Sequence, residues 1–333
     1  MTLLVTGGLG FVMSNFVLHW LRQHDGERAI VLDRGEPDAL ARAFFAPVSG
    51  RVTFIAADIA QWGVWQSLPP GVTVVAHGAA LTPSGEAEEK ASARAIVEVN
   101  VLGTANALDW ARTQDGLRRF LYVSTGGVYV DEDPRGPGLP LPEEGYVDPR
   151  PRTLYPITKS ASEQLAGRFA TLWSMPLAVV RLSSVYGPMD RPTIGRRIRC
   201  VPNRLCHLAL QGKTIRVDGL QAVGDYVYAP DVASALTLLA DAGTLEHRAY
   251  NIADGRLVTT EAMLEELRAL LPETRWVAAR APDADVTGDP AKVSGKWGAY
   301  DVSRLQGLGW QPTALRDCLA HYLDWIRGAR TLS

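Results

Sequence analysis

Tyr155 and Lys159 are the pair in this sequence best suited to chemistry, because they stand four residues apart in the segment YPITK. A helix can begin at Pro156, since a residue in a first helical turn needs no partner for its N–H. Four residues make about one turn, so the phenol and the ammonium share a face. A neighbouring cation favours phenolate and would let Tyr155 exchange a proton with a substrate hydroxyl. A surface Tyr–Lys pair on a solvated helix is the alternative explanation.

A strand, a glycine-rich turn and a helix at the start of the sequence indicate where a cofactor would bind. Residues 3–6 are apolar, the turn runs from Gly7 to Gly10, and an amphipathic helix follows. Glycines let the backbone approach a pyrophosphate, and the helix N-terminus supplies donors. The next strand ends in Asp33, which is placed to accept hydrogen bonds from an adenosine ribose. A carboxylate there repels a 2′-phosphate and favours NAD over NADP, although Arg34 beside it could weaken that preference.

Further strand patterns end in polar residues, namely 52–56 before Asp58, 72–76 before His77, and 119–123 before Ser124 and Thr125. An open α/β sheet binds its ligand at the carboxyl ends of its strands. Asp58 is therefore a candidate for the adenine amino group and Thr125 for a substrate oxygen. Capping of a turn explains the Ser124-Thr125 pair equally well. His77 is better explained as a hydrogen-bonded strand-end residue than as a catalyst.

The second half of the chain has a less regular pattern. A sixth strand is predicted at 177–182, and residues 131–151, rich in proline and acid, are expected to form a loop over the site. Five arginines stand within 190–204 and could bind an anionic group, although a solvated loop is at least as good an explanation. Residues 225–233 predict a strand entering a helix, and 313–327 predict a closing amphipathic helix.

Composition describes an ordinary globular protein. The 333 residues are 47% hydrophobic and 21% charged, with a net charge of −2, which argues against a broad nucleic-acid-binding surface. No apolar run approaches the length needed to cross a bilayer, so no membrane partner is expected. The three cysteines have no metal-binding or redox spacing. We therefore expect reduced cysteines, no bound metal and a cytoplasmic location.

The ordered set of motifs resembles the extended short-chain dehydrogenase/reductase family, which holds the sugar-nucleotide epimerases and dehydratases. The matches are TGGLGF at 6–11, Asp33, AADI at 56–59, VVAHGAA at 74–80, VN at 99–100, STGGVY at 124–129, YPITK at 155–159, RLSSVYGP at 181–188, DYVYAPDVA at 225–233, YNI at 250–252 and LGWQP at 308–312. The resemblance implies an α/β fold with a Rossmann-type, doubly wound, mostly parallel sheet and bound NAD. It predicts an NAD-binding domain over 1–182, to which part of 225–255 returns, and a smaller α/β substrate lobe over 183–333.

The resemblance also assigns roles to individual residues. Thr125 would hydrogen-bond the reacting oxygen, Tyr155 would exchange its proton, and Lys159 would tune Tyr155 and hold the nicotinamide ribose. Residues expected to bind the cofactor are Gly7, Gly10, Phe11, Val12, Asp33, Arg34, Asp58, Ile59, Gly78, Ala79, Ala80, Asn100, Val123, Tyr155, Lys159 and Leu182. Residues expected to bind the substrate are Thr82, Thr125, Ser183, Ser184 and Arg280.

Departures from the family pattern narrow the reaction. The third glycine of the family's turn is Met13 here, which should push the first helix slightly and weaken cofactor binding. Dehydratases of the family have Asp-Glu where this chain has Gly126-Gly127, and the cysteine of the carbon-3/carbon-5 epimerases is also missing. At two positions where the family has an asparagine and an arginine that help hold a nucleotide diphosphate, this chain has Ser184 and Gly224. The second diphosphate-binding arginine of the family has a match in Arg280. A substrate smaller than a sugar nucleotide is therefore expected.

Three functions remain open. The leading hypothesis is a cytoplasmic NAD-dependent oxidoreductase acting on a secondary alcohol or ketone of a sugar, a sugar acid or another small polar substrate. The alternative is a nucleotide-sugar 4-epimerase that retains its NAD, and a non-catalytic NAD-binding regulator is a third. A homodimer is expected, because the helix after Tyr155 carries a broad apolar face and family members commonly pair through this helix. That face comprises Ile157, Ala161, Leu165, Phe169 and Leu172.

Overall fold

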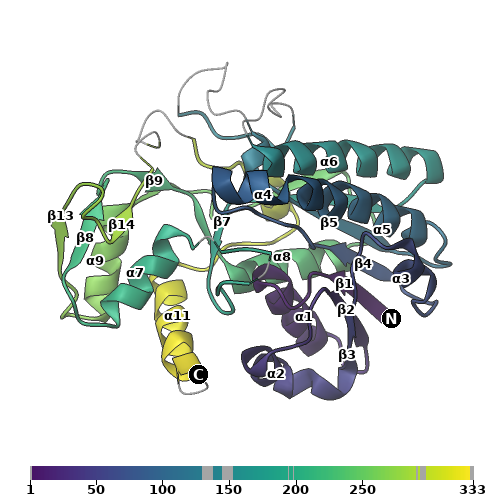
Figure 1. Ribbon diagram of the computed structural model, residues 1–333, viewed down its shortest axis with the longest axis horizontal. Helices are drawn as coiled ribbons and strands as arrows, with labels where there is room; N and C mark the ends of the chain where they lie inside the picture. Colours follow the sequence, from purple (N-terminus) through teal and green to yellow (C-terminus); the bar gives the residue numbers. More distant parts are fainter. Residues whose placement is uncertain are drawn as a thin grey trace.

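A seven-stranded parallel sheet forms the centre of the molecule (Figure 1). The structure, a computed structural model, describes residues 2–129, 138–144, 153–193, 195–197, 199–289, 292 and 298–330. The strands lie in the order β11-β6-β5-β4-β1-β2-β3, which is the doubly wound arrangement that the sequence predicts. Their bounds are β1 Thr2–Thr6, β2 Arg28–Asp33, β3 Val52–Ala56, β4 Val74–His77, β5 Arg119–Thr125, β6 Leu177–Leu182 and β11 Ala249–Ile252.

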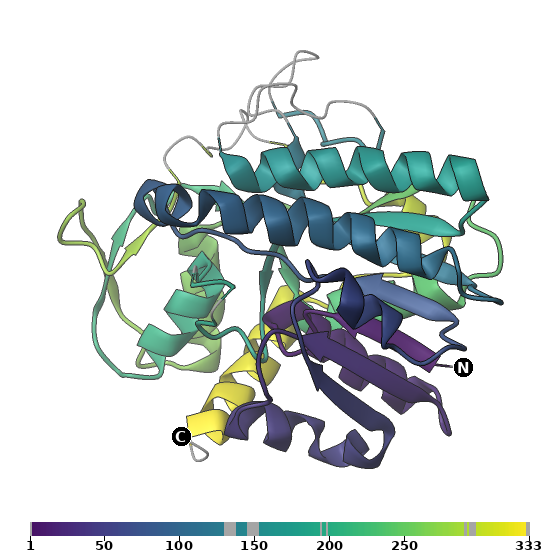
Figure 2. The same cartoon turned by 45° about the vertical axis from the view of Figure 1, so that its right-hand side comes forward.

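Helices cover both faces of the sheet, as their apolar stripes require (Figure 2). On one face α1 (Phe11–Gln23) packs along α8 (Ala229–Asp241), with α2 (Ala39–Phe45) nearby, around buried side chains such as Phe16 and Trp20. On the other face lie α3 (Trp62–Gln66), α5 (Gly103–Ala111) and α6 (Leu154–Trp173). The carboxyl edge of the sheet, where both layers leave the strand ends accessible, is where the site forms.

The helix that leads to Asn100 begins with α4 (Glu86–Val97). Three glutamates in its first turn stabilise that start through the helix dipole. The helix continues through a π-helical turn, η2 (Glu98–Leu102), into α5. Asn100 lies in that turn, which re-aims side chains next to the site.

The remaining elements form a smaller group beside the sheet. β7 (Ser184–Tyr186) pairs with β10 (Tyr226–Tyr228), β9 (Val223–Gly224) with β12 (Val258–Thr259), and β8 (Ile215–Asp218) with β13 (Trp276–Ala278) and β14 (Val286–Thr287). The helices are α7 (Val201–Ala209), α9 (Thr260–Leu270), α10 (Ser303–Gly307) and α11 (Leu315–Arg330), and short 3₁₀ turns span Ala46–Arg51 and Gly126–Val128. Leu205, Leu264 and Tyr322 belong to a core of their own. The division of the chain at residue 182 stays a prediction.

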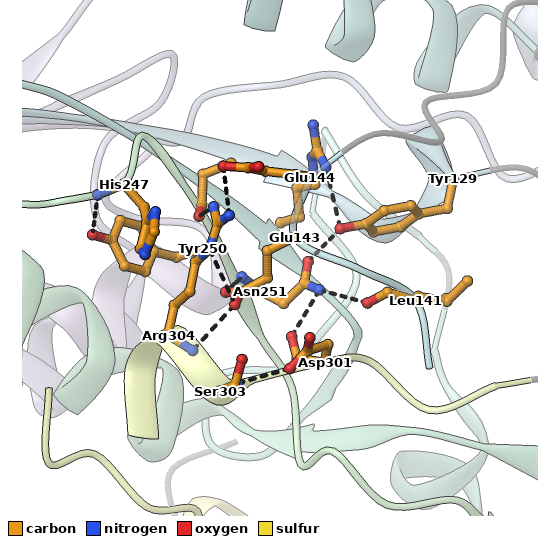
Figure 3. Close-up of polar contacts among 12 residues, drawn as sticks. Tyr129, Leu141, Glu143, Glu144, His247, Tyr250, Asn251, Asp301, Ser303 and Arg304 are labelled. Atoms are coloured by element: carbon orange, nitrogen blue, oxygen red, sulfur yellow. Dashed lines mark hydrogen bonds and ion pairs between the residues drawn. The ribbon is translucent and has the colours of Figure 1, made fainter. Parts of the chain in front are cut away.

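A buried polar network at the end of β11 holds three distant segments together (Figure 3). The Asn251 side chain accepts a hydrogen bond from the Tyr129 hydroxyl (2.7 Å) and donates to the carbonyl oxygens of Leu141 (3.1 Å) and Asp301 (2.9 Å). Glu143 in turn accepts from the Asn251 N–H at 2.8 Å. This network fixes the segment around Tyr300 against the end of β5. The other residues expected to form a loop over the site, 131–137 and 145–151, lie outside the described part of the chain.

Candidate active site

A cavity of about 560 Å³ lies at the carboxyl ends of the central strands. Of the residues predicted to bind cofactor, those that line it are Gly7, Gly10, Phe11, Val12, Asp33, Arg34, Asp58, Ile59, Gly78, Ala79, Ala80, Val123, Tyr155, Lys159 and Leu182. Of the predicted substrate residues, Thr82, Thr125, Ser183 and Ser184 also line it. These predicted residues come from seven separate segments of the chain and line one cavity.

The glycine turn after β1 has the shape of a dinucleotide cradle. Gly7 adopts φ +69°, and a Cβ there would lie 2.8 Å from the Cα of Ala79, so only glycine fits. The next helix, α1, begins after Gly10 without a side-chain cap, which leaves its first N–H groups available to a phosphate. Phe11 and Val12, the first residues of that helix, face the cavity. The turn thus fits the pyrophosphate of a dinucleotide.

Asp33 lies at the end of β2 on the cavity wall. One carboxylate oxygen accepts from the N–H of Leu9 (2.9 Å) and the other from the N–H of Arg34 (2.7 Å). Each oxygen has a second lone pair, so both can also accept from a ribose hydroxyl. Burial raises the pKa of Asp33, while these N–H groups and the Arg191 guanidinium oppose that rise.

Met13 takes the place of the third glycine without an evident steric conflict. Its side chain is buried at 3% exposure, and a Cβ on Gly78 would lie 2.4 Å from its Cγ. Gly78 therefore supplies the space that Met13 uses. The glycine needed for close packing has moved from the helix to the neighbouring strand end, which accounts for a methionine at this position.

Tyr155 presents its phenol to two threonines at the centre of the cavity. It lies in the first turn of α6, with Pro156 after it, and lines the cavity together with Thr82 and Thr125, which are close enough to act on the pKa of the phenol. The Thr125 hydroxyl also accepts from the N–H of Gly127 at 3.1 Å. Burial raises the pKa of Tyr155, and these two hydroxyls and the Arg196 guanidinium oppose the rise. The phenol is therefore protonated at neutral pH in the cofactor-free protein.

Lys159 is not among the groups that act on the pKa of Tyr155 in this structure, so its predicted effect on the phenol stays a prediction. Its ammonium lies over the ring of Tyr122, 4.4 Å from the ring centroid, and the side chain is 3% exposed. Burial lowers the pKa of Lys159 to about 7, opposed by the Glu163 carboxylate. Lys159 therefore lies against a different ring from the phenol that it is predicted to tune.

Asn100 and Arg280 lie outside the cavity lining. Asn100 is buried, and its side chain accepts from the N–H of Leu81 (2.8 Å) and donates to the Thr158 hydroxyl (3.0 Å). It therefore positions the cavity wall from behind. Arg280 is exposed beyond the end of β13 and does not line the cavity, and its predicted substrate contact stays a prediction. His77 is confirmed as a buried strand-end residue, bonded to the hydroxyls of Thr6 (2.8 Å) and Thr104 (3.0 Å).

The segment 190–197 is the main part of the site that sequence reasoning did not place. Arg191 and Arg196 line the cavity, whereas Arg197, Arg199 and Arg204 are exposed. The Arg191 guanidinium binds the Asp38 carboxylate on the opposite wall at 2.8 Å. The arginine-rich composition indicated an anion-binding segment, but nothing in the sequence showed which two arginines would line the cavity. Cys200, expected to be a packing residue, also lines the cavity, although burial raises the pKa of its thiol to about 12.

The Gly126-Gly127 pair has a structural explanation. A Cβ on Gly126 would overlap the Tyr300 hydroxyl, so this position has no room for the aspartate that dehydratases carry. Gly127 is exposed and has ordinary contacts. Within the described residues, no cluster of three potential metal ligands occurs, and no helix is long and apolar enough to cross a membrane.

Comparisons with known proteins agree with this geometry. The family model described as "NAD dependent epimerase/dehydratase family" matches residues 3–253. The chain is 28% identical to the dTDP-glucose 4,6-dehydratase of Mycolicibacterium smegmatis, over 98% of this chain and 93% of the relative. It is also 28% identical to the dTDP-L-rhamnose 4-epimerase of Burkholderia thailandensis, over 97% of this chain and 94% of the relative.

A solved structure shares the fold. The Thermus thermophilus UDP-glucose 4-epimerase in complex with NAD aligns with a TM-score of 0.77 and 25% identity, covering 99% of this chain and all of that chain. The cradle, the Asp33 carboxylate and the Tyr155 cluster fit the same cofactor, NAD. The chain therefore belongs to the NAD-dependent epimerase/dehydratase family and is an NAD-dependent enzyme of the extended short-chain dehydrogenase type.

Proposed function

We propose that this enzyme catalyses hydride transfer at a secondary alcohol or ketone of a sugar, sugar acid or other small polar substrate. One observation carries the proposal. Tyr155, Thr125 and Lys159 line the same cavity as Asp33 and the glycine cradle, and Thr125 is close enough to Tyr155 to act on the pKa of its phenol. When bound, NAD supplies the hydride chemistry, and the protein supplies the proton exchange and the orientation.

The side chains at the catalytic end have distinct tasks in this proposal. Tyr155 gives its proton to a carbonyl oxygen during reduction or takes it from a hydroxyl during oxidation, as a general acid or base. Thr125 donates a hydrogen bond to the same oxygen and so fixes its position. Lys159 is placed to bind a ribose hydroxyl as an ammonium. A cation brought closer to the phenol by that binding would lower the pKa of Tyr155.

The cavity favours a substrate smaller than a sugar nucleotide. Ser184 replaces the family's diphosphate-binding asparagine, and Gly224 lies in β9 outside the cavity lining. Arg280, the third candidate, is exposed away from the lining. None of these three positions, at which family members bind a diphosphate, therefore places a charged side chain in the cavity lining. This supports a free sugar, a sugar acid or another small alcohol.

A nucleotide-sugar 4-epimerase is the second candidate, and a specific observation favours it. Residues 191–193 and 195–196 line the cavity, and Arg191 at one end of this stretch forms an ion pair with Asp38. At the other end the Gly195 carbonyl accepts from the N–H of Thr82 at 2.9 Å. A cofactor beneath such a segment would leave slowly, which suits an enzyme that oxidises and re-reduces one substrate without releasing NADH.

A substrate screen tests both candidates. Sugars, sugar acids and nucleotide sugars are incubated with the enzyme and NAD, and both NADH absorbance and product identity are recorded. The leading proposal predicts NADH in stoichiometric amount with an oxidised product. The second predicts an epimer with no accumulation of NADH. A protein that binds NAD but turns over no compound of any class would support the non-catalytic alternative.

We also propose that the enzyme is a cytoplasmic homodimer. The apolar face expected on α6 is not all core, because Ile157 is 41% and Leu172 51% exposed. Val97 and Leu102, on the neighbouring α4–η2 helix, are 45% and 47% exposed. Figure 2 shows these helices side by side on the outer face. Light scattering at micromolar concentration should give the mass of two chains, and a monomer would end this proposal.

A further inference from the structure

All the carboxylates that line the cavity stand at one of its ends, together with the cations Arg34 and Arg191. The four carboxylates follow β2 or β3, at the end where Asp33 would hold the adenosine ribose; they are Asp33, Glu36, Asp38 and Asp58. The end that holds Tyr155 has two cations, Lys159 and Arg196. Among the described lining residues, no carboxylate faces them. This end therefore favours a ligand group of negative charge.

Arg196 is held firmly enough to act as a binding group. One Nη atom donates to the Asp190 carboxylate at 2.5 Å, and the guanidinium lies over the Phe11 ring, 5.1 Å from its centroid. The Asp190 side chain is fully buried, so water has little access to its ion pair with Arg196. The turn that carries Arg196 is fixed as well, since Thr82 and Arg196 form a β-bridge.

The guanidinium has binding capacity left over. Among the described residues, the Arg196 side chain hydrogen-bonds only to Asp190, which uses one of its five N–H donors. The side chain keeps 28% exposure and lines the cavity. It is also close enough to Tyr155 to act on the charge of the phenol. Its remaining donors are thus available to a ligand next to the proton-exchanging hydroxyl.

Resting on the proposed function, we propose that Arg196 binds a carboxylate that the substrate carries close to its reacting carbon. The substrate class is then a sugar acid or a similar polyhydroxy acid rather than a neutral sugar. A planar guanidinium with a free edge matches the two oxygens of a carboxylate. Lys159 at the same end adds positive charge when it is protonated, although its own contact is with the cofactor ribose in the proposed mechanism.

Binding to the NAD-loaded enzyme tests the proposal without requiring turnover. Calorimetry compares D-glucuronate with D-glucose, at equal ionic strength, for the wild type and for Arg196→Ala, Arg196→Lys and Arg197→Ala. We expect glucuronate to bind on the order of 10-fold more tightly than glucose, because a charge-assisted bond is formed. Arg196→Ala should abolish the preference, and Arg196→Lys should retain part of it.

Arg197→Ala is the matched control, because Arg197 is adjacent, 67% exposed and absent from the cavity lining. It should keep the full preference. Equal binding of both sugars by the wild type, or a preference that survives Arg196→Ala, would overturn the proposal. So would an Arg196→Ala enzyme that loses NAD affinity instead, since the guanidinium would then serve the cofactor diphosphate. Arg196→Lys keeps a cation opposite Asp190, so a result is obtained even if the alanine variant does not fold.

Discussion

Replacing Lys159 with methionine should stabilise the cofactor-free protein at neutral pH while it impairs the enzyme. The ammonium is 3% exposed, and burial lowers the pKa of Lys159 from 10.5 to about 7. Below pH 7 both the folded and the unfolded chain carry the proton, and the folded state pays the full cost of burying the charge. Methionine has a similar length and no charge, so Lys159→Met removes that cost.

The dependence on pH gives the effect its sign and size. Above pH 7 the folded chain releases the proton while the unfolded chain keeps it up to about pH 10.5, so wild-type stability rises with pH across this window. From pH 7 to 9 the gain is roughly 2 kcal/mol, since one pKa unit corresponds to about 1.4 kcal/mol. The stability advantage of Lys159→Met should therefore shrink by about that amount.

Urea unfolding of the cofactor-free proteins at pH 6, 7, 8 and 9 measures this advantage. Lys90→Met is the matched control, because the Lys90 side chain is 75% exposed. Its difference from the wild type should stay constant with pH. If the difference between Lys159→Met and the wild type also stayed constant from pH 6 to 9, the ammonium would not be desolvated as the structure indicates.

Three further substitutions test separate parts of the site. Asp33→Asn should lower the ratio of NAD affinity to NADP affinity roughly 10-fold, as measured by calorimetry. Glu36→Gln, which changes an exposed carboxylate at the same rim, should leave the ratio unchanged. An unchanged ratio in Asp33→Asn would contradict the ribose contact. Thr125→Val should slow turnover by roughly 10²-fold with NAD affinity nearly intact, and wild-type turnover would remove the residue from the catalytic set. Gly126→Ala should lower the free energy of unfolding by about 1–3 kcal/mol in a denaturant melt, because the added methyl group overlaps Tyr300. Gly127→Ala should leave the stability unchanged. Equal stabilities of the two variants would show that the overlap is relieved at no cost.

The sequence predicted the sheet and the cavity well because both depend on local patterns. Glycine turns, apolar strands and the polar residues that end them are encoded within a few residues, and the parallel sheet brings those ends to one edge. Asp33, Thr125 and Tyr155 accordingly meet in one cavity. The bounds of β3 and β6 also follow from short patterns of this kind.

What the sequence did not predict depends on contacts between distant segments. The space for Met13 is provided by Gly78, and the space above Gly126 is taken by Tyr300. The pKa of Lys159 is set by burial against Tyr122, which spacing on a helix cannot reveal. Long-range packing of this kind has no signature in a single chain, so the electrostatics of the site required the structure.

The turnover of Tyr155→Phe tests the central claim most directly. The substitution removes the hydroxyl that lies near Thr82 and Thr125 and keeps the ring, so the fold and the NAD affinity should change little. On the substrate found in the screen, turnover should fall by roughly 10²–10⁴-fold, the usual effect of removing a general acid or base. Wild-type turnover in Tyr155→Phe would contradict the account, because the proton would then be exchanged by another group.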